Sequence, residues 1–350
     1  MELPQTLADF ERLAAERLDP GPHGYFAGGA GDELTMMASE EAWRRLQIRP
    51  RVLVDVSERD PSTTVLGVER PHPLIVAPMA FHRLVHPEAE PVTARGAAAT
   101  GTPFCLSTLA TTSPAELAAA VPDAPRWFQL YVFKDRGVTN GLVESATESG
   151  FEALVVTVDL PIQGRRERDL RNAFRIDASV PSVGGRSGMS LPEMVEQFDA
   201  SLAWDDVERL ADDSRLPVLV KGILTPEDAR RAQAAGVAGV VVSNHGGRQL
   251  DTVPASADVL PRVAEEVGDE LDVIVDGGIR RGTDILKAMA LGARAVMIGR
   301  PAIWGLAVGG ADGVRHTLEI LLGELDVALA LAGTPVAANL DATSVERPYG

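Results

Sequence analysis

The sequence has almost no cysteine and no long apolar segment. Its 350 residues include one cysteine, Cys105, so no disulfide can form within the chain. No apolar stretch approaches the roughly 18 uninterrupted residues that a membrane-spanning helix needs. Residues 1–5 also lack the basic region and apolar core of a secretory signal. We therefore expect a cytoplasmic protein in which Cys105, within the apolar run 103–107, is a buried and inert thiol.

Basic residues are scarce relative to acidic ones. The 33 Lys and Arg residues against 50 Asp and Glu residues give a formal net charge of −17. Such a surface repels nucleic acid and anionic membranes, although a local basic pocket can still bind an anionic ligand. The 45% hydrophobic and 24% charged content is typical of a globular protein with a sizeable core. We expect neither a nucleic-acid partner nor a membrane partner.

Short apolar runs alternate with longer segments of helical periodicity from residue 73 onward. Their nearly continuous aliphatic composition is typical of strands that are buried on both faces. The predicted strands are 73–77, 103–107, 126–130, 153–158, 217–221, 237–242, 272–276 and 294–298. Eight strands with helices between them favour a (β/α)8 TIM barrel over a doubly wound sheet, which usually has about six strands.

Residues 1–70 precede the first predicted strand. Helical patterns at about 5–19 and 31–46 predict a helical cap on the barrel within a single domain that spans residues 1–350. Pro20, Gly21 and Pro22 are expected to break the first helix.

The longest interval between predicted strands runs from residue 159 to residue 216. Its middle, 179–188, is too rich in Gly, Ser and Pro for regular structure. Loops of this length in compact domains are usually functional or disordered. We expect 175–203 to form an active-site lid, with a plain disordered insertion as the alternative.

A histidine and an arginine follow the predicted strand 237–242 within the segment 243–251, Ser-Asn-His-Gly-Gly-Arg-Gln-Leu-Asp. Catalytic groups in a (β/α)8 barrel come from the C-terminal ends of the strands. His245 can accept a proton near neutral pH, and Arg248 offers a planar fork that suits a carboxylate. A 2-hydroxy acid has both a carboxylate and an acidic proton. An isolated His and Arg would more often form a satisfied structural pair, but the strand-end position favours a site.

Polar residues follow other predicted strands as well. Asp159 could accept a hydrogen bond from His245 and stabilise the imidazolium, with helix capping as its competing role. Lys221 would be costly to bury without an anion, and it could stabilise negative charge on a reduced cofactor ring. A lysine paired with a nearby carboxylate is the alternative.

The last two predicted strands end in turns of the form expected for a phosphate site. These turns are DGGIRRG at 276–282 and IGRP at 298–301. Their glycines let backbone N–H groups approach an anion, while Arg280 and Arg300 add positive charge at helix starts. Either turn alone is more simply structural, but the pair predicts a phosphorylated cofactor or substrate.

With these residues placed, the sequence resembles the FMN-dependent 2-hydroxy-acid oxidase and dehydrogenase family, which includes glycolate oxidase, lactate oxidase, mandelate dehydrogenase and 4-hydroxymandelate oxidase. The resemblance covers nearly the whole chain. Its motifs are YFAGGAGDE at 25–33, FQLYVFKD at 128–135, TVDLPIQGRRERDLRN at 157–172, LVKGI at 219–223, SNHGGRQLD at 243–251, DGGIRRGTD at 276–284 and IGRP at 298–301.

The resemblance implies a role for each catalytic position. His245 would remove the substrate proton with support from Asp159, and Tyr131 would contact the substrate hydroxyl. The groups implied to hold the substrate carboxylate are Tyr25, Arg166 and Arg248. The 2-hydroxy acid would become a 2-keto acid as two electrons enter FMN. Oxygen would then be reduced to hydrogen peroxide. Direct hydride transfer and prior formation of a carbanion both stay open.

The same resemblance implies the FMN contacts, and it implies no metal. Lys221 would lie beside the pyrimidine side of the ring, and Asp276 would bind the ribityl chain. The residues implied along the ring face are Pro78, Met79 and Ala80, and those at its polar edges are Ser107, Gln129, Thr157 and Ser243. The implied phosphate contacts are Gly278, Arg280, Gly299 and Arg300.

Departures from the family pattern bear on the substrate. Leu109 stands where glycolate oxidase has a tryptophan, which should leave room for a larger substrate side chain. An aromatic wall is possible from Phe26, Phe81 and His82, with core packing as an equal alternative for the phenylalanines. The segments 78–88 and 27–33 look most like the hydroxymandelate oxidases. An aryl 2-hydroxy acid is therefore favoured, with lactate or another aliphatic acid second.

Further features of the sequence concern the electron acceptor, membrane association and the oligomeric state. Ala80 resembles the oxidase-type residue at a position where some dehydrogenases have glycine, which favours reaction with oxygen. Residues 175–200 lack the apolar, basic insertion of the membrane-bound members, and the resemblance suggests a homotetramer. Two remoter alternatives are a barrel aldolase or isomerase with Lys221 as a Schiff base, and a non-catalytic barrel that binds FMN or an acidic metabolite.

Overall fold

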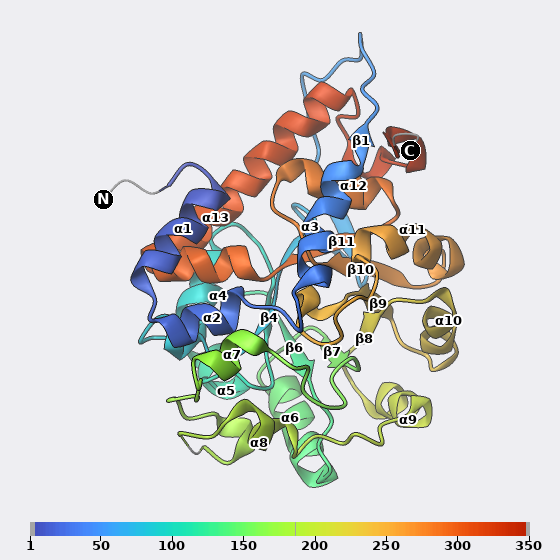
Figure 1. Cartoon of the computed structure of the whole chain (residues 1–350). Coiled ribbons are helices and arrows are strands. Elements are labelled where there is room, and N and C mark those ends of the chain that lie inside the picture. The colour runs from blue at the N-terminus through green and yellow to red at the C-terminus, as the bar shows by residue number, and fades with distance from the viewer. Residues whose placement is uncertain (1–3, 186, 348–350) are drawn as a thin grey trace.

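The structure, a computed structural model, describes residues 4–185 and 187–347. Within these residues, eight parallel strands close into a barrel with helices around it (Figure 1). The barrel strands are β4 (Leu74–Met79), β5 (Phe104–Leu106), β6 (Arg126–Leu130), β7 (Leu154–Thr157), β8 (Val218–Ile223), β9 (Gly239–Val242), β10 (Asp272–Asp276) and β11 (Ala295–Ile298). They follow one another in chain order, and β11 pairs with β4 to close the ring. The predicted (β/α)8 barrel is confirmed, with a strand in each of the eight predicted segments.

Helices surround this barrel. They are α4 (Glu90–Ala98), α5 (Pro114–Ala120), α6 (Arg136–Glu148), α9 (Trp204–Asp213), α10 (Pro226–Ala234), α11 (Ser256–Val267), α12 (Gly282–Ala290) and α13 (Arg300–Ala332). Several begin where the sequence supplies a capping side chain: Ser113 forms a capping box with Glu116, and Thr225 caps α10. In the described part of the chain, none of the helices is long and apolar enough to cross a bilayer.

The barrel interior is apolar and closed at its N-terminal end. Alternate strand residues such as Ile75, Trp127 and Ile274 form one cluster, in which Cys105 is completely buried. Burial raises the pKa of the Cys105 thiol, in agreement with the inert role expected for it. Val65 joins the same cluster from a hairpin of β2 (Thr63–Val65) and β3 (Val68–Arg70).

The N-terminal segment forms three helices where the sequence predicted two. The expected pair is present as α1 (Leu7–Arg17) and α3 (Leu34–Arg45), and between them lies α2 (Pro20–Ala27). Pro20 ends the first helix as expected, but it also begins the next one, because proline is favoured in the first turn. α1 packs against α13, and α3 packs against α11 and the short helix η3 (His245–Gly247). β1 (Gln47–Ile48) pairs with β12 (Val345–Glu346) beyond the cap.

The segment predicted as a lid contains only short elements. These are η2 (Pro181–Val183) and α8 (Leu191–Val195), preceded by α7 (Glu167–Arg171). Its buried side chains, including Val180 and Met194, pack in a cluster with Tyr25 and Tyr131. Arg186 of this segment and both ends of the expected 1–350 domain lie outside the described residues. The segment is packed against the barrel, and its role as a lid stays a prediction.

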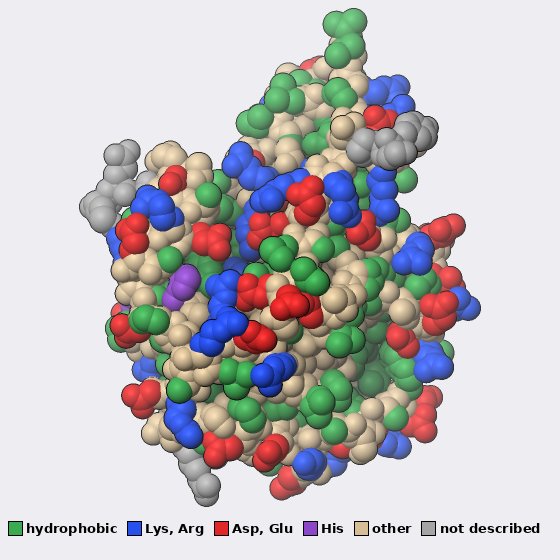
Figure 2. Space-filling view, viewed as in Figure 1, with side chains coloured by type: hydrophobic (Ala, Val, Ile, Leu, Met, Phe, Trp, Pro, Cys, Tyr) green, Lys and Arg blue, Asp and Glu red, His purple; other side chains and the backbone are tan. Residues whose placement is uncertain are grey.

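The surface agrees with a globular protein of mixed charge. On the face in Figure 2, Lys and Arg side chains are interspersed with Asp and Glu side chains.

The helices α12 and α13 pack closely where they meet. A Cβ atom added at Gly282 would lie 2.2 Å from the backbone nitrogen of Leu325 and 2.4 Å from the carbonyl carbon of Glu324. Only glycine fits at this contact.

We expect Gly282→Ala to destabilise the protein by about 1–3 kcal/mol, because the two helices would have to separate. Gly323→Ala on α13 is the matched control, since a Cβ there meets nothing within 4 Å. The control should gain about 0.5–1 kcal/mol, because alanine has less backbone entropy to lose in a helix. Thermal unfolding of the two purified holoproteins measures both. Equal melting temperatures would contradict the packing argument.

Candidate active site

A cavity of about 1050 Å³, including its open mouth, lies at the C-terminal ends of the barrel strands. The cavity is lined by every residue proposed from the sequence as catalytic or cofactor-binding except Asp159 and Ser243. The lining members of that set are Tyr25, Pro78, Met79, Ala80, Ser107, Gln129, Tyr131, Thr157, Arg166, Lys221, His245, Arg248, Asp276, Gly278, Arg280, Gly299 and Arg300. The two exceptions lie directly behind the wall, each hydrogen-bonded to a residue that does line it.

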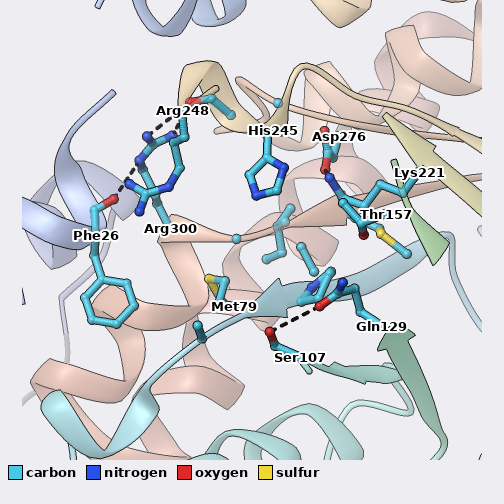
Figure 3. Close-up of a pocket in the computed structure, with 18 of the residues that line it drawn as sticks. Phe26, Met79, Ser107, Gln129, Thr157, Lys221, His245, Arg248, Asp276 and Arg300 are labelled. Carbon is cyan, nitrogen blue, oxygen red and sulfur yellow. Dashed lines mark hydrogen bonds and ion pairs between the residues drawn. The ribbon is translucent and has the colours of Figure 1, made fainter. Parts of the chain in front are cut away.

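His245 and Asp159 form a hydrogen-bonded pair at the ends of β9 and β7. The His245 Nδ1 atom lies 2.8 Å from Asp159 Oδ1, which leaves Nε2 as the ring nitrogen for a ligand. Figure 3 shows the imidazole of His245 pointing into the cavity. Burial lowers the pKa of His245, and the Asp159 carboxylate only partly offsets this effect. Burial alone would raise the pKa of Asp159, but the adjacent His245 holds it below its ordinary value. The pair is therefore a neutral imidazole beside an ionised carboxylate, as a general base requires.

Two arginines converge on the cavity beside this pair. Arg248 donates from Nη1 to the carbonyl oxygens of Tyr25 at 2.5 Å and Gly28 at 2.8 Å. Arg166 donates to the carbonyl oxygen of Arg248 and to the amide oxygen of Gln249, both at 3.2 Å. These acceptors are all neutral. Burial, followed by the charge of Arg248, lowers the pKa of Arg166 to about 10. An anionic ligand between the two guanidinium groups would relieve this repulsion.

Lys221 lies across the cavity from the arginines and is held by two acceptors. Its Nζ atom lies 2.7 Å from Ser243 Oγ and 3.1 Å from Asp276 Oδ2. Burial alone would lower the pKa of Lys221, but Asp276 and Asp159 together raise it above its ordinary value. Pairing with a carboxylate, the alternative interpretation of this lysine, is what the structure shows. The group is held as an ammonium ion, which can stabilise negative charge but is a poor Schiff-base nucleophile.

The wall beside Lys221 contains polar atoms that need a ligand. Gln129 accepts hydrogen bonds at Oε1 from Ser107 Oγ and from the Thr108 backbone, as Figure 3 shows for Ser107. Within the described residues, three buried atoms of this wall have no hydrogen-bond partner: Gln129 Nε2, Thr157 Oγ1 and Asp276 Oδ1. Buried polar groups are nearly always satisfied in native proteins, so these atoms indicate a ligand that offers donors and acceptors here. The carbonyl and N–H groups of a flavin and the hydroxyls of its ribityl chain fit that requirement.

The far end of the cavity has the features of a phosphate site. Gly277 and Gly278 have φ values of 91° and 78°, and a Cβ at Gly278 would lie 2.2 Å from the Ser39 carbonyl oxygen. Arg300 begins α13, whose first part runs to a break at Gly309 and Gly310, so a helix N-terminus points positive partial charge at this end. The Arg300 guanidinium donates to the carbonyl oxygens of Phe26, Gly28 and Gly246. Burial, with the charges of Arg248 and Arg280, lowers its pKa to about 9. A phosphate dianion here would compensate that charge.

The proposed aromatic wall is only partly present. Phe26 and Leu109 line the cavity. Phe81 and His82 are fully buried away from it, and His82 Nδ1 bonds to Thr93 Oγ1 at 2.9 Å. For Phe81 the core-packing alternative holds, and the prediction that His82 joins the wall is wrong because His82 is buried beside Thr93.

Sequence reasoning missed several contributors. Leu160 and Leu191 line the cavity, and Leu191 comes from α8 in the predicted lid. Gln249 bonds Arg166 through its amide oxygen and donates from Nε2 to the Asp159 carbonyl oxygen at 3.1 Å. Its place inside the motif 243–251 was a signal for such a role, as was the place of Leu160 inside the motif 157–172, whereas no local pattern marks Leu191.

Comparisons with known proteins agree with this site. The family model described as FMN-dependent dehydrogenase matches residues 14–347. An L-lactate oxidase of Nostoc sp. is 46% identical over 97% of this chain and 97% of its own length. A peroxisomal (S)-2-hydroxy-acid oxidase of Oryza sativa subsp. japonica is also 46% identical, over 95% of this chain and 93% of its own.

Solved structures are similarly close. A mandelate oxidase variant with (S)-mandelic acid has a TM-score of 0.90 at 40% identity and covers 99% of both chains. A soluble mutant of the membrane-associated (S)-mandelate dehydrogenase from Pseudomonas putida has a TM-score of 0.92 at 37% identity, over 98% of this chain and 99% of its own. The cavity, its unsatisfied polar wall and these matches lead to one conclusion. The chain belongs to the FMN-dependent dehydrogenase family, with FMN as its cofactor and the oxidation of a 2-hydroxy acid as its reaction.

Proposed function

We propose that the protein oxidises an aryl 2-hydroxy acid, such as mandelate or 4-hydroxymandelate, to the 2-keto acid and reduces dioxygen to hydrogen peroxide. One hydroxy acid and one O2 give one keto acid and one H2O2, so atoms and electrons balance. FMN, when bound, would supply the two-electron redox chemistry that links the substrate to oxygen. The observation that carries the proposal is the His245–Asp159 pair, 2.8 Å apart, in one cavity with Arg166 and Arg248.

Each side chain of the proposed site has a distinct role in this reaction. Arg166 and Arg248 bind the substrate carboxylate, because guanidinium forks match its two oxygens. Burial raises the pKa of Tyr131, so its phenol stays protonated and can hydrogen-bond the substrate hydroxyl. His245 accepts one proton at Nε2, both in direct hydride transfer and in prior loss of the carbon-bound proton. Asp159 stabilises the resulting imidazolium.

The apolar lining supports an aryl side chain. Phe26, Leu109, Leu160 and Leu191 face the same cavity as the proposed base. Apolar contacts of this kind bind a phenyl ring more strongly than a methyl group, by roughly 25 cal/mol for each Å² of apolar surface buried. The mandelate oxidase variant solved with (S)-mandelic acid supports the same choice. The identity of 46% to a lactate oxidase favours the second candidate, a small aliphatic acid.

Ala80 supports oxygen as the acceptor, by its resemblance to the oxidase-type residue, and it lines the cavity. We further propose a cytoplasmic homotetramer of single-domain subunits. Exposed apolar side chains near the end of α13 support self-association: Leu53, with φ 61°, is fully exposed, and Val52 and Leu331 are largely so. The Arg51 backbone N–H donates to the Ala332 carbonyl oxygen, which fixes this arm to α13.

Anaerobic reduction of the bound flavin tests the substrate class. Mandelate and 4-hydroxymandelate should bleach the visible flavin band faster than lactate or glycolate, and readmitted air should restore it with release of peroxide. Stopped-flow absorbance measures the reduction of the flavin, and a peroxide assay measures its reoxidation by oxygen. Bleaching by lactate alone would move the substrate to the aliphatic class. Slow recovery in air with fast recovery by an artificial acceptor would identify a dehydrogenase.

The pH dependence tests the base. His245 acts only when neutral, and its pKa lies below the ordinary value, so kcat/KM should rise with pH through an acid limb below about 6.5 and then level off. Asp159→Asn removes a carboxylate that raises the His245 pKa, so the limb should move to lower pH. Turnover should also fall by about 100-fold or more, because the imidazolium loses its partner. Asp205→Asn on α9, which is exposed, is the control. An unmoved limb in Asp159→Asn would remove His245 from the role of base.

Replacing Arg248 by Lys tests the carboxylate clamp. A point charge cannot reproduce the fork or its bonds to Tyr25 and Gly28, so kcat/KM should fall on the order of 10–100-fold. Arg171→Lys on α7 is an exposed control that should change nothing. Steady-state kinetics with the best substrate of the series gives both values. An unaffected Arg248→Lys enzyme would place the carboxylate elsewhere.

A further inference from the structure

The loop between β4 and α4 has unusual backbone geometry at both of its ends. Phe81 has φ 62° and ψ 42°, and Ala89 has φ 55° and ψ −139°. The conformation of Ala89 is one that glycine adopts readily and that a Cβ atom disfavours. Both residues are completely buried. Such geometry persists only where the surroundings hold the loop firmly.

The Glu90 carboxylate holds the loop in this geometry. Glu90 begins α4 and is completely buried. Its Oε1 atom accepts from the His82 backbone at 3.1 Å and from the Thr111 backbone at 2.8 Å. Its Oε2 atom accepts from the hydroxyls of Thr111 and Thr112, both at 2.7 Å. Four donors therefore converge on one buried carboxylate.

These donors are neutral, which makes their placement critical. The imidazole of His82 lies in the same region, and burial lowers its pKa despite the opposing effect of Glu90, so it supplies no full charge at neutral pH. A buried carboxylate is costly unless its oxygens are satisfied, and neutral hydrogen bonds satisfy them only in a narrow geometry. Displacing either loop would leave the carboxylate short of donors.

The two loops that Glu90 joins both line the active-site cavity. Met79 and Ala80 precede His82 in one loop, and Ser107 and Leu109 precede Thr111 in the other. A backbone bond from Phe81 N–H to the Leu109 carbonyl oxygen, at 3.3 Å, also joins them, and the strands before the two loops pair at Met79 and Leu106. Beyond that strand pairing, the bonds to Glu90 are shorter than the Phe81 bond, with one from the His82 side and three from Thr111 and Thr112.

We propose that Glu90 is a positioning residue, which fixes the distance between Ala80 and Leu109 and thereby selects the substrate side chain. It touches neither substrate nor FMN, and it acts through the two loops. The inference deepens the proposed function, because the preference that it sets is the aryl preference proposed above. Loosening the loops should let the cavity accept aryl and aliphatic acids more evenly.

Glu90→Gln tests this inference, with Glu88→Gln as a matched control. The glutamine amide nitrogen cannot accept, so one side of the four-donor arrangement is lost. Glu88 is exposed and its carboxylate pairs with Arg95, so the control removes a carboxylate two residues away that makes no bond to the loop of Thr111 and Thr112. The ratio of kcat/KM for mandelate to that for lactate should move toward one by on the order of fivefold in Glu90→Gln, roughly the factor that one hydrogen bond is worth. The visible circular dichroism of bound FMN should change with it, and Glu88→Gln should match the wild type.

Thr111→Val provides a second variant should Glu90→Gln fail to fold. It removes one hydroxyl donor and keeps the backbone N–H bond, so a smaller shift in the same direction is expected. Lower melting temperatures with an unchanged substrate ratio and unchanged flavin dichroism would reduce Glu90 to a purely structural residue and overturn the inference. If neither acid reduces the flavin of the wild type, the proposed function fails instead, and the flavin dichroism of the variants still decides the role of Glu90.

Discussion

Buried positive charge is the constraint on which the rest of the site depends. Arg166, Arg248 and Arg300 lie around one cavity and donate to neutral oxygens, and burial depresses the pKa of Arg166 and of Arg300. Such an arrangement is costly in the absence of anions and favourable with two of them, a carboxylate at one end and a phosphate at the other. The cavity therefore selects for a phosphorylated cofactor and a carboxylic acid together.

The N-terminal cap is what keeps these cations in place. The Asp251 carboxylate accepts from the backbone N–H groups of Asp32 and Thr35, at 3.0 Å and 2.8 Å. A Cβ at Gly247 would lie 2.6 Å from the Met36 nitrogen, so the motif that contains His245 and Arg248 packs directly on the start of α3. The cap is thus part of the binding site, since the carbonyls of Tyr25, Phe26 and Gly28 orient two of the arginines.

The sequence predicted the barrel and most of the candidate site because both depend on local pattern. Buried parallel strands have continuous apolar runs, and barrel geometry brings the residues after each run to one face. Contacts that depend on loop conformation carried no such signal. Leu191 reaches the cavity from a loop distant in sequence, and Phe81 turns into the core because its left-handed backbone reverses the chain after Ala80. No feature of the sequence marked Glu90, and only the fold shows that it joins two loops.

Two buried bases of the site reach opposite protonation states for one electrostatic reason. Lys221 and His245 are both buried, and burial disfavours the cation in each. Lys221 is held in its charged form by Asp276 as well as Asp159, whereas His245 has Asp159 alone and is opposed by the charges of Lys221 and Arg166. The ammonium ion beside the predicted flavin position therefore helps to keep the imidazole neutral. We therefore propose that one fixed cation serves both halves of the reaction: it would stabilise the reduced cofactor, and it would keep the proposed base free to accept a proton.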